Sequence, residues 1–274
     1  MDPIVLAGLI VMGLGAGVLG ALFGLGGGII FVPLLMLVFG LAPTEAVAIS
    51  LIGIIAGSVG ASTVFVDKGL SNVRLGLLME ITTAAGAIIG AIVATYLQEW
   101  VLMVIFAAIV YISGYRMLRN PEKVVPPSED SSGRYAFRYS DESNGESIDY
   151  EVQHIGGGMA LCTVAGMISS MTGVGGGMVK VPLMNIYMHV PMKAASATSS
   201  YMIGITAFSG AVTYFLGGQV LLKYAAGVAI GAFLGALVGT SLTRRIDAKH
   251  LRKYFSVVVF IMATMVLLQA VGVL

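Results

Sequence analysis

Apolar residues along the chain form ten runs that polar or glycine-rich breaks separate. In the first half the runs cover roughly residues 4–22, 28–41, 45–66, 75–97 and 101–118, and in the second half roughly 155–172, 177–189, 193–216, 221–243 and 253–273. A helix needs about 20 apolar residues to cross a bilayer core of about 30 Å. The pattern therefore predicts an all-α polytopic membrane protein. The second run of each half is too short to cross without distortion.

A polar stretch at 119–153 separates the two halves. It holds eight of the 14 acidic residues, and its prolines break helices. Loosely alternating residues flank the turn signal Ser143-Asn144-Gly145, so one interpretation is a small β-hairpin outside the membrane and the other is a disordered linker. We divide the chain into a first transmembrane repeat at 1–118, an acidic loop at 119–153 and a second transmembrane repeat at 154–274.

Composition supports the membrane class and excludes several others. The chain is 57% hydrophobic and 11% charged, whereas soluble domains carry about 25% charged residues. A single cysteine, Cys162, excludes a disulfide scaffold. A net charge of +1 leaves no electrostatic footprint for nucleic acid. The expected partners are thus the lipid bilayer and a small solute, and the association of several copies into a homo-oligomer stays open.

The distribution of positive charge predicts how the chain is oriented. Of the 15 lysines and arginines, 13 fall in the segments 67–74, 116–153, 189–193 and 244–253. Basic loops face the cytoplasm, so the loop at 119–153 is expected there and both termini on the opposite side. The first run lacks a positive leading segment, so we interpret it as a retained helix rather than a cleaved signal peptide.

The two halves contain the same motif. Gly24-Leu-Gly-Gly-Gly-Ile-Ile-Phe-Val-Pro33-Leu matches Gly173-Val-Gly-Gly-Gly-Met-Val-Lys-Val-Pro182-Leu, and Pro43–Ser50 and Gly86–Ala91 have counterparts at Pro191–Thr198 and Gly231–Ala236. Five runs in each half is an odd number, so the halves are predicted to be inverted repeats, each with a glycine-broken short helix or a re-entrant hairpin. This arrangement marks secondary transporters and points to their substrate site.

The duplicated G-x-G-G-G-x-x-x-V-P-x-L motif, with the Ala/Ser/Thr-rich helix start that follows it, resembles the sulfite exporter TauE/SafE family. The resemblance covers the chain outside the insert at 119–153. It implies a protein of the cell inner membrane that moves sulfite, sulfonates or related small organic anions. The family's Thr-Ser pair is present as Thr198-Ser199, whereas the first half has Ile49-Ser50.

The two glycine motifs are the first candidates for substrate binding. Successive glycines unwind a helix at low cost and let a ligand approach the backbone, and the short helix that follows presents free N–H groups to an anion. The candidate residues are Gly24, Gly26, Gly27, Gly28, Gly173, Gly175, Gly176 and Gly177. The alternative is that glycines let membrane helices pack closely, which we favour for scattered positions such as Gly13 and Gly86.

Two charged residues inside apolar runs are further candidates. Lys180 lies one turn after Gly177, where its counterpart in the first half is Phe31. Ionisable residues inside membranes are costly and usually functional, so Lys180 is expected to bind an anionic substrate; the alternative is a lysine that snorkels to the interface. Glu80 is a candidate proton-coupling residue, or a carboxylate near the headgroups that pairs with Arg74.

Hydroxyl groups complete the candidate substrate site. Ser50, Thr198 and Ser199 lie in the matched helix starts, where a hydroxyl can either solvate an anion or bond to a neighbouring helix. The sequence contains no G-x-S-x-G, H-E-x-x-H, G-x-x-x-x-G-K-[ST] or C-x-x-C motif, so neither an enzyme nor a cofactor or metal is expected.

The favoured function is therefore a secondary transporter or exporter of small sulfur-containing anions, working by alternating access at a midplane site. Without a nucleotide site, such transport would run on an ion gradient or on the membrane potential. A gated anion channel is the alternative. An intramembrane enzyme or a structural subunit is a third hypothesis.

Overall fold

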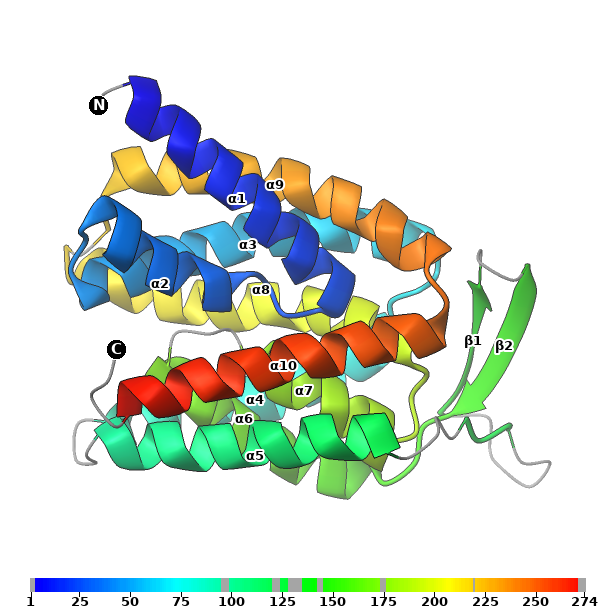
Figure 1. Ribbon diagram of the computed structural model, residues 1–274. Helices are drawn as coiled ribbons and strands as arrows, with labels where there is room; N and C mark the ends of the chain where they lie inside the picture. The colour runs from blue at the N-terminus through cyan, green and yellow to red at the C-terminus, as the bar shows by residue number, and fades with distance from the viewer. Residues whose placement is uncertain are drawn as a thin grey trace.

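The computed structural model describes residues 3–94, 99–119, 124–127, 135–141, 145–172, 176–218 and 220–270. Within these residues the chain forms ten α-helices and one two-stranded sheet (Figure 1). The first half contains α1 (Pro3–Phe23), α2 (Gly28–Phe39), α3 (Pro43–Asp67), α4 (Val73–Ala94) and α5 (Glu99–Arg119). The strands β1 (Ala136–Asp141) and β2 (Glu146–Glu151) follow. The second half contains α6 (Ile155–Thr172), α7 (Gly177–Pro182), the π-helical turn η1 (Leu183–Tyr187), α8 (Met192–Leu216), α9 (Leu222–Arg245) and α10 (Ala248–Ala270).

The all-α membrane class that the apolar runs predict is confirmed. In the described part of the chain, three helices are long and apolar enough to cross a bilayer: α1, α3 from Glu45 to Asp67, and α9. The short run after each glycine motif forms a short helix, α2 or α7. In Figure 1, α2 runs back toward the end of the bundle at which α1 begins, so these two helices form a hairpin joined at the first glycine motif.

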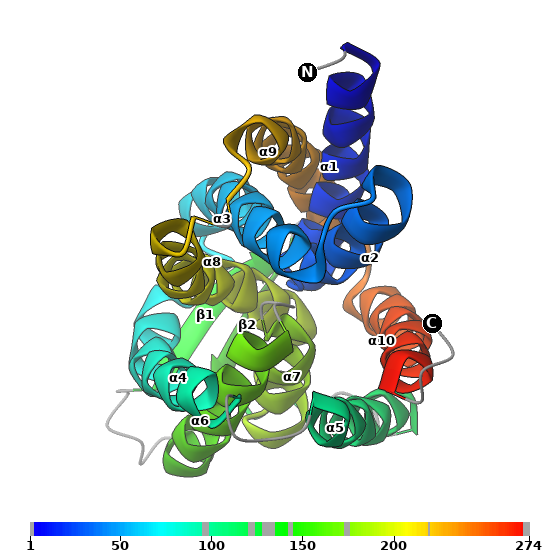
Figure 2. The ribbon, with the colours of Figure 1, turned by 90° about the vertical axis from the view of Figure 1, so that its left-hand side faces the viewer.

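Helices from opposite halves of the chain pair with each other. α1 packs along α9, α4 packs along α6, and α5 pairs with α10, while α3 lies against both α8 and α9. Figure 2 shows these groups seen from one end of the bundle. The pairing is reciprocal, because the fourth helix of each half packs on the first helix of the other half. The inverted relation of the halves stays a prediction.

Close approach at these helix pairs depends on matched glycines. A Cβ atom on Gly86 of α4 would lie 2.0 Å from the carbonyl oxygen of Thr163, and one on Gly231 of α9 would lie 2.2 Å from the carbonyl oxygen of Ile10. The helix backbones touch at these points, as small residues allow in membrane bundles. The packing interpretation of the scattered glycines therefore holds for Gly86 and equally for Gly13, whose Cβ would lie 2.7 Å from Val228 O.

The loop between the halves contains the β-hairpin rather than a disordered linker in its described part. β1 and β2 pair antiparallel, with Arg138 opposite Asp149. These two exposed side chains form a bidentate ion pair with N–O distances of 2.5 and 2.8 Å. Hydrogen bonding from Arg138 lowers the pKa of the Asp149 carboxyl below its ordinary value.

The hairpin is fastened to the helix bundle through Tyr150. The Tyr150 side chain is buried between Phe137 and Tyr139, and its hydroxyl accepts a hydrogen bond from Asn72 Nδ2 at 3.2 Å, in the loop between α3 and α4. Burial raises the pKa of Tyr150 to about 12, so the phenol stays neutral at physiological pH. The start of α1 and the end of α10 lie at the opposite end of the bundle from the hairpin (Figure 1).

Replacing Tyr150 by phenylalanine is expected to lower the free energy of unfolding by about 1 kcal/mol, because the buried amide of Asn72 loses its acceptor. For a chain of this size the melting temperature in detergent should fall by about 2–4 °C. Tyr254→Phe is the matched control, since Tyr254 is half exposed on α10. An unchanged melting temperature in Tyr150→Phe would show that this contact does not hold the hairpin.

Candidate functional site

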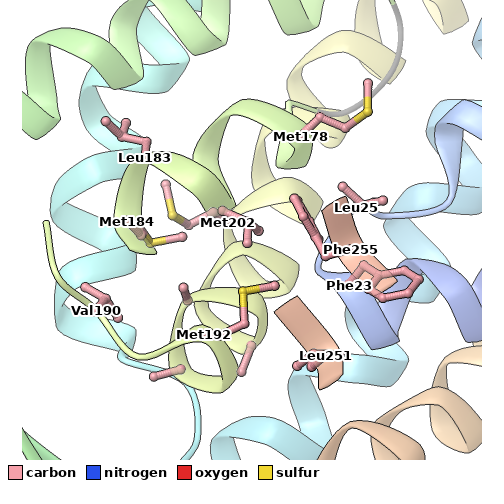
Figure 3. Packing of buried hydrophobic residues seen from close by; sticks show 14 of the residues in the cluster. Phe23, Leu25, Met178, Leu183, Met184, Val190, Met192, Met202, Leu251 and Phe255 are labelled. Carbon is pink, nitrogen blue, oxygen red and sulfur yellow. The ribbon is translucent and has the colours of Figure 1, made fainter. Parts of the chain in front are cut away.

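The two glycine motifs meet in the interior of the bundle. A Cβ atom on Gly177, the first residue of α7, would lie 2.2 Å from the carbonyl oxygen of Gly24 and 2.9 Å from Leu25 Cα. No side chain fits between these two backbones. Leu25 and Met178, which follow Gly24 and Gly177 in the sequence, belong to one buried cluster with Met202 of α8 (Figure 3). Residues about 150 positions apart in sequence therefore form one junction.

Glycine is needed at this junction for its backbone conformation. Gly24, Gly26 and Gly27 have φ values of 69°, 74° and 80°, and Gly176, which precedes α7, has a φ of 70°. L-amino acids with a side chain rarely adopt this left-handed region. The motif ends α1 and starts α2 at Gly28 by this means, which accounts for the duplicated Gly-x-Gly-Gly-Gly sequence. Gly173 and Gly175 lie outside the described residues.

The hydroxyl groups of the matched helix starts bond to the protein itself in this conformation. Ser199 Oγ donates to the carbonyl oxygen of Gly24 at 2.8 Å, and Ser50 Oγ lies 3.5 Å from the carbonyl oxygen of Gly28. Thr198 Oγ1 accepts a hydrogen bond from the backbone N–H of Asn72 at 2.9 Å. All three side chains are fully buried. In this conformation the three hydroxyl groups therefore bond to the backbone of neighbouring segments: the glycine break after α1, the start of α2, and the loop between α3 and α4.

Lys180 forms a buried polar group with Glu80 and Thr206. Its Nζ lies 3.1 Å from Glu80 Oε2 and 2.8 Å from Thr206 Oγ1. Thr206 Oγ1 in turn donates to Glu80 Oε1. Lys180 is 0% exposed and Glu80 is 3% exposed, so water does not screen the pair. Taking two charges out of water costs several kcal/mol per ion, which only close pairing with good geometry repays.

These three side chains come from three different helices. α7 holds Lys180 one turn after the contact between Gly177 and Gly24, while α4 supplies Glu80 and α8 supplies Thr206. α7 has six residues, with Pro182 as the last, and the chain continues directly in the π-helical turn η1. Proline removes a backbone donor, and short π-helical segments often lie at functional sites.

The interior beside the first glycine motif is almost completely filled. The cavity lined by Gly26, Ser58 and Ser200 has a volume of about 10 Å³, which is room for about one water molecule. Of the polar atoms here, Ser58 Oγ donates to the carbonyl oxygen of Ser200 at 2.5 Å, and Ser200 Oγ has no hydrogen-bond partner among the described residues. An anion of several atoms does not fit this cavity, so this conformation is closed there.

Comparison with known proteins decides the family. The family model described as sulfite exporter TauE/SafE matches residues 9–266 of the chain. The chain belongs to the sulfite exporter TauE/SafE family. The match spans both glycine motifs and the Lys180 group. In the comparison with solved structures, none matches this chain.

Two relatives that align with this TauE/SafE chain over nearly their whole length are named probable membrane transporters. The probable membrane transporter protein YunE of Bacillus subtilis is 29% identical over 270 residues, which cover 96% of this chain and 97% of the relative. The probable membrane transporter protein YfcA of Escherichia coli K12 is 24% identical over 276 residues, covering 99% and 93%. The chain is thus a multi-pass membrane transporter rather than an enzyme.

Within this TauE/SafE protein the structure gathers most of the candidate residues predicted from the sequence. Gly24 contacts Gly177, Ser199 bonds to Gly24, and Lys180 lies one turn farther along α7. Glu80 pairs with Lys180, whereas Arg74, the partner considered from the sequence, is exposed. Lys180 is fully buried and does not snorkel.

Thr206 is the polar residue that the sequence analysis missed. Two signals point to it. It lies eight residues after Thr198, which places both on one face of α8 because residues four apart in a helix share a face. It also corresponds to Ser58 when the repeats are aligned on Pro43 and Pro191, since 58 lies 15 residues after 43 and 206 lies 15 residues after 191.

Proposed function

We propose that this TauE/SafE protein is a secondary transporter of small sulfur-containing anions such as sulfite or sulfonates, and that the substrate binds beside Lys180 at the junction of the two glycine motifs. The observation that carries the proposal is the buried Lys180 ammonium, one turn from two broken helices that meet backbone to backbone. A buried cation next to unwound backbone suits a small anion.

In this conformation the Glu80 carboxylate occupies the position beside Lys180 Nζ that a substrate anion would take. Its carboxylate lies 3.1 Å from Lys180 Nζ and satisfies the cation while no anion is bound. A sulfite or sulfonate oxygen would replace one carboxylate oxygen as acceptor, with Thr206 and Ser199 as nearby hydroxyl donors. The motif glycines Gly26–Gly28 and Gly176–Gly177 would let the anion approach the backbone, as would Gly173 and Gly175.

Transport then requires the interior to open. Lys180 is 0% exposed, and the cavity at the first glycine motif holds about one water, so helices must move apart before an anion enters. We propose that alternating access supplies this movement. We place the site near the bilayer midplane, in the cell inner membrane. The hairpin would face the cytoplasm and both termini the opposite side, which agrees with their location at opposite ends of the bundle (Figure 1).

Flux measurements in proteoliposomes test this function. The wild-type chain should show saturable counterflow of at least one anion from a panel of sulfite, thiosulfate, sulfoacetate and methanesulfonate. Lys180→Met should lower that flux by about 10- to 100-fold, the value of a lost charge-assisted hydrogen bond. The matched control is Lys223→Met, because Lys223 is an exposed lysine at the start of α9.

Three results would count against parts of the proposal. No wild-type flux with any anion of the panel would refute the substrate class. If Lys180→Met transports the anion as fast as the wild type, Lys180 is not part of the substrate site. Large single-channel currents in place of saturable counterflow would identify a gated anion channel.

A further inference from the structure

We infer that each monoanion crosses together with one proton, and that Glu80 is the carboxylate that carries this proton. The inference rests on the proposed function, because it concerns the same site. It begins from the surroundings of Glu80, whose carboxylate is buried and contacts Lys180 of α7 and Thr206 of α8. Cys162 of α6 lies near enough to interact electrostatically with both charges, and a thiol is ordinarily neutral at pH 7.

Charge balance in the buried site requires the proton. With Lys180 protonated and Glu80 ionised, the site has no net charge. A monoanion that binds Lys180 while Glu80 stays ionised leaves one uncompensated negative charge where water does not screen it. Protonation of Glu80 restores neutrality. Anion binding and proton binding should therefore favour each other.

The cycle balances in atoms and charge. On the side from which the anion enters, a proton from water bonds to a carboxylate oxygen of Glu80, and the anion takes over the contact with the Lys180 ammonium. On the other side the anion leaves, Glu80 returns its proton to water, and the ion pair forms again. Thr206 can serve both states, since its hydroxyl donates to ionised Glu80 and can accept from the protonated acid.

The asymmetry of the repeats sets the stoichiometry at one proton. The position that corresponds to Lys180 in the first half is Phe31. With the repeats aligned on Gly86 and Gly231, Glu80 corresponds to Ala225. Both Phe31 and Ala225 are buried in an apolar cluster. The first glycine motif therefore has no matching acid and base at these positions, and one carboxylate serves the whole site.

Anion binding as a function of pH provides the first test. In detergent, the affinity of the wild-type chain for methanesulfonate, measured by thermal stabilisation, should fall by up to tenfold per pH unit as pH rises. Glu80→Gln resembles the protonated acid, so its affinity should be independent of pH. This variant leaves Lys180 without a counter-charge, so methanesulfonate should stabilise it more than it stabilises the wild type. Glu45→Gln, at the exposed start of α3, should behave like the wild type.

Transport driven by imposed gradients provides the second test. A pH gradient alone should drive wild-type proteoliposomes to accumulate methanesulfonate on the alkaline side, and a membrane potential alone should not, because proton and monoanion move without net charge. Glu80→Gln should exchange labelled methanesulfonate for unlabelled at equilibrium but should not accumulate it in response to the pH gradient.

The possible failures are distinguishable. Accumulation in Glu80→Gln that still follows the pH gradient would overturn the role of Glu80, and wild-type accumulation driven by the potential alone would overturn proton coupling. Either result would leave anion transport itself intact. No flux of any anion of the panel would refute the proposed function, and the coupling with it.

Discussion

Replacing Lys180 by methionine alone is expected to lower the free energy of unfolding by about 3–5 kcal/mol, because the change leaves the buried Glu80 carboxylate without its cation. Glu80 is 3% exposed, so water cannot take over the role of the ammonium. The melting temperature in detergent should fall by about 10 °C. The same loss is expected when Glu80 alone is replaced by methionine, since an unpaired buried lysine is equally costly.

Removing both charges together should restore most of this stability. The double variant Lys180→Met and Glu80→Met replaces the ion pair by apolar side chains of similar size, a change that is often neutral or stabilising in buried sites. Thr206 keeps a hydrogen bond to the carbonyl oxygen of Met202 at 3.2 Å, so no hydroxyl is orphaned. Melting temperatures of the four chains form a double-mutant cycle. Additive losses in the double variant would show that the two charges do not interact.

The same double variant separates folding from function. If the ion pair exists for transport rather than for stability, the double variant should be folded and yet transport the anion poorly. Its melting temperature would then lie near that of the wild type, while its flux would be lowered about 10- to 100-fold, as in Lys180→Met. Because stability and flux move apart in this one chain, the loss of transport in the double variant could not be assigned to misfolding.

Local chemistry explains what could be predicted from the sequence. The helices follow from the length of the apolar runs, and the breaks at Gly24–Gly28 follow from the need for positive φ values at Gly24, Gly26 and Gly27. The hairpin follows from the turn at Gly145, where φ is 69°. Each of these features depends on residues within a few positions of one another, so periodicity and residue type carry the information.

The pairing of Lys180 with Glu80 could not be predicted in the same way. The two residues are 100 positions apart, and their distance depends on how α4 and α7 pack. That packing rests on close backbone contact, as between Gly166 of α6 and the carbonyl oxygen of Thr83 of α4, where a Cβ would lie 2.1 Å from the oxygen. The sequence shows that Lys180 and Glu80 are both unusual inside a membrane, but it does not show that they form a pair.

The filling of the interior beside the first glycine motif also could not be predicted from the sequence. Glycines and hydroxyls at the motifs predict a polar pocket, but its volume depends on neighbouring side chains. Ile54 and Ile203 pack against Gly26 so closely that a Cβ there would lie 2.8 Å from Ile203. Residue types alone give no measure of this filling. Only three-dimensional packing shows that the first glycine motif is covered by isoleucine in this conformation.

Replacing Gly177 by alanine is expected to have the other large effect, because the two glycine motifs touch at this residue. The added Cβ would lie 2.2 Å from the carbonyl oxygen of Gly24 and 2.9 Å from Leu25 Cα. Both contacts are with backbone, so rotation of a side chain cannot relieve them. The helices must therefore separate. We expect a loss of about 3 kcal/mol in the free energy of unfolding, the upper range for overpacked interiors, and an anion flux near that of empty liposomes.

Gly15→Ala is the control, since its Cβ would meet nothing within 4 Å. Equal melting temperatures and equal anion flux in Gly177→Ala and Gly15→Ala would show that the two motifs do not need to touch, and would remove the junction from the proposed site.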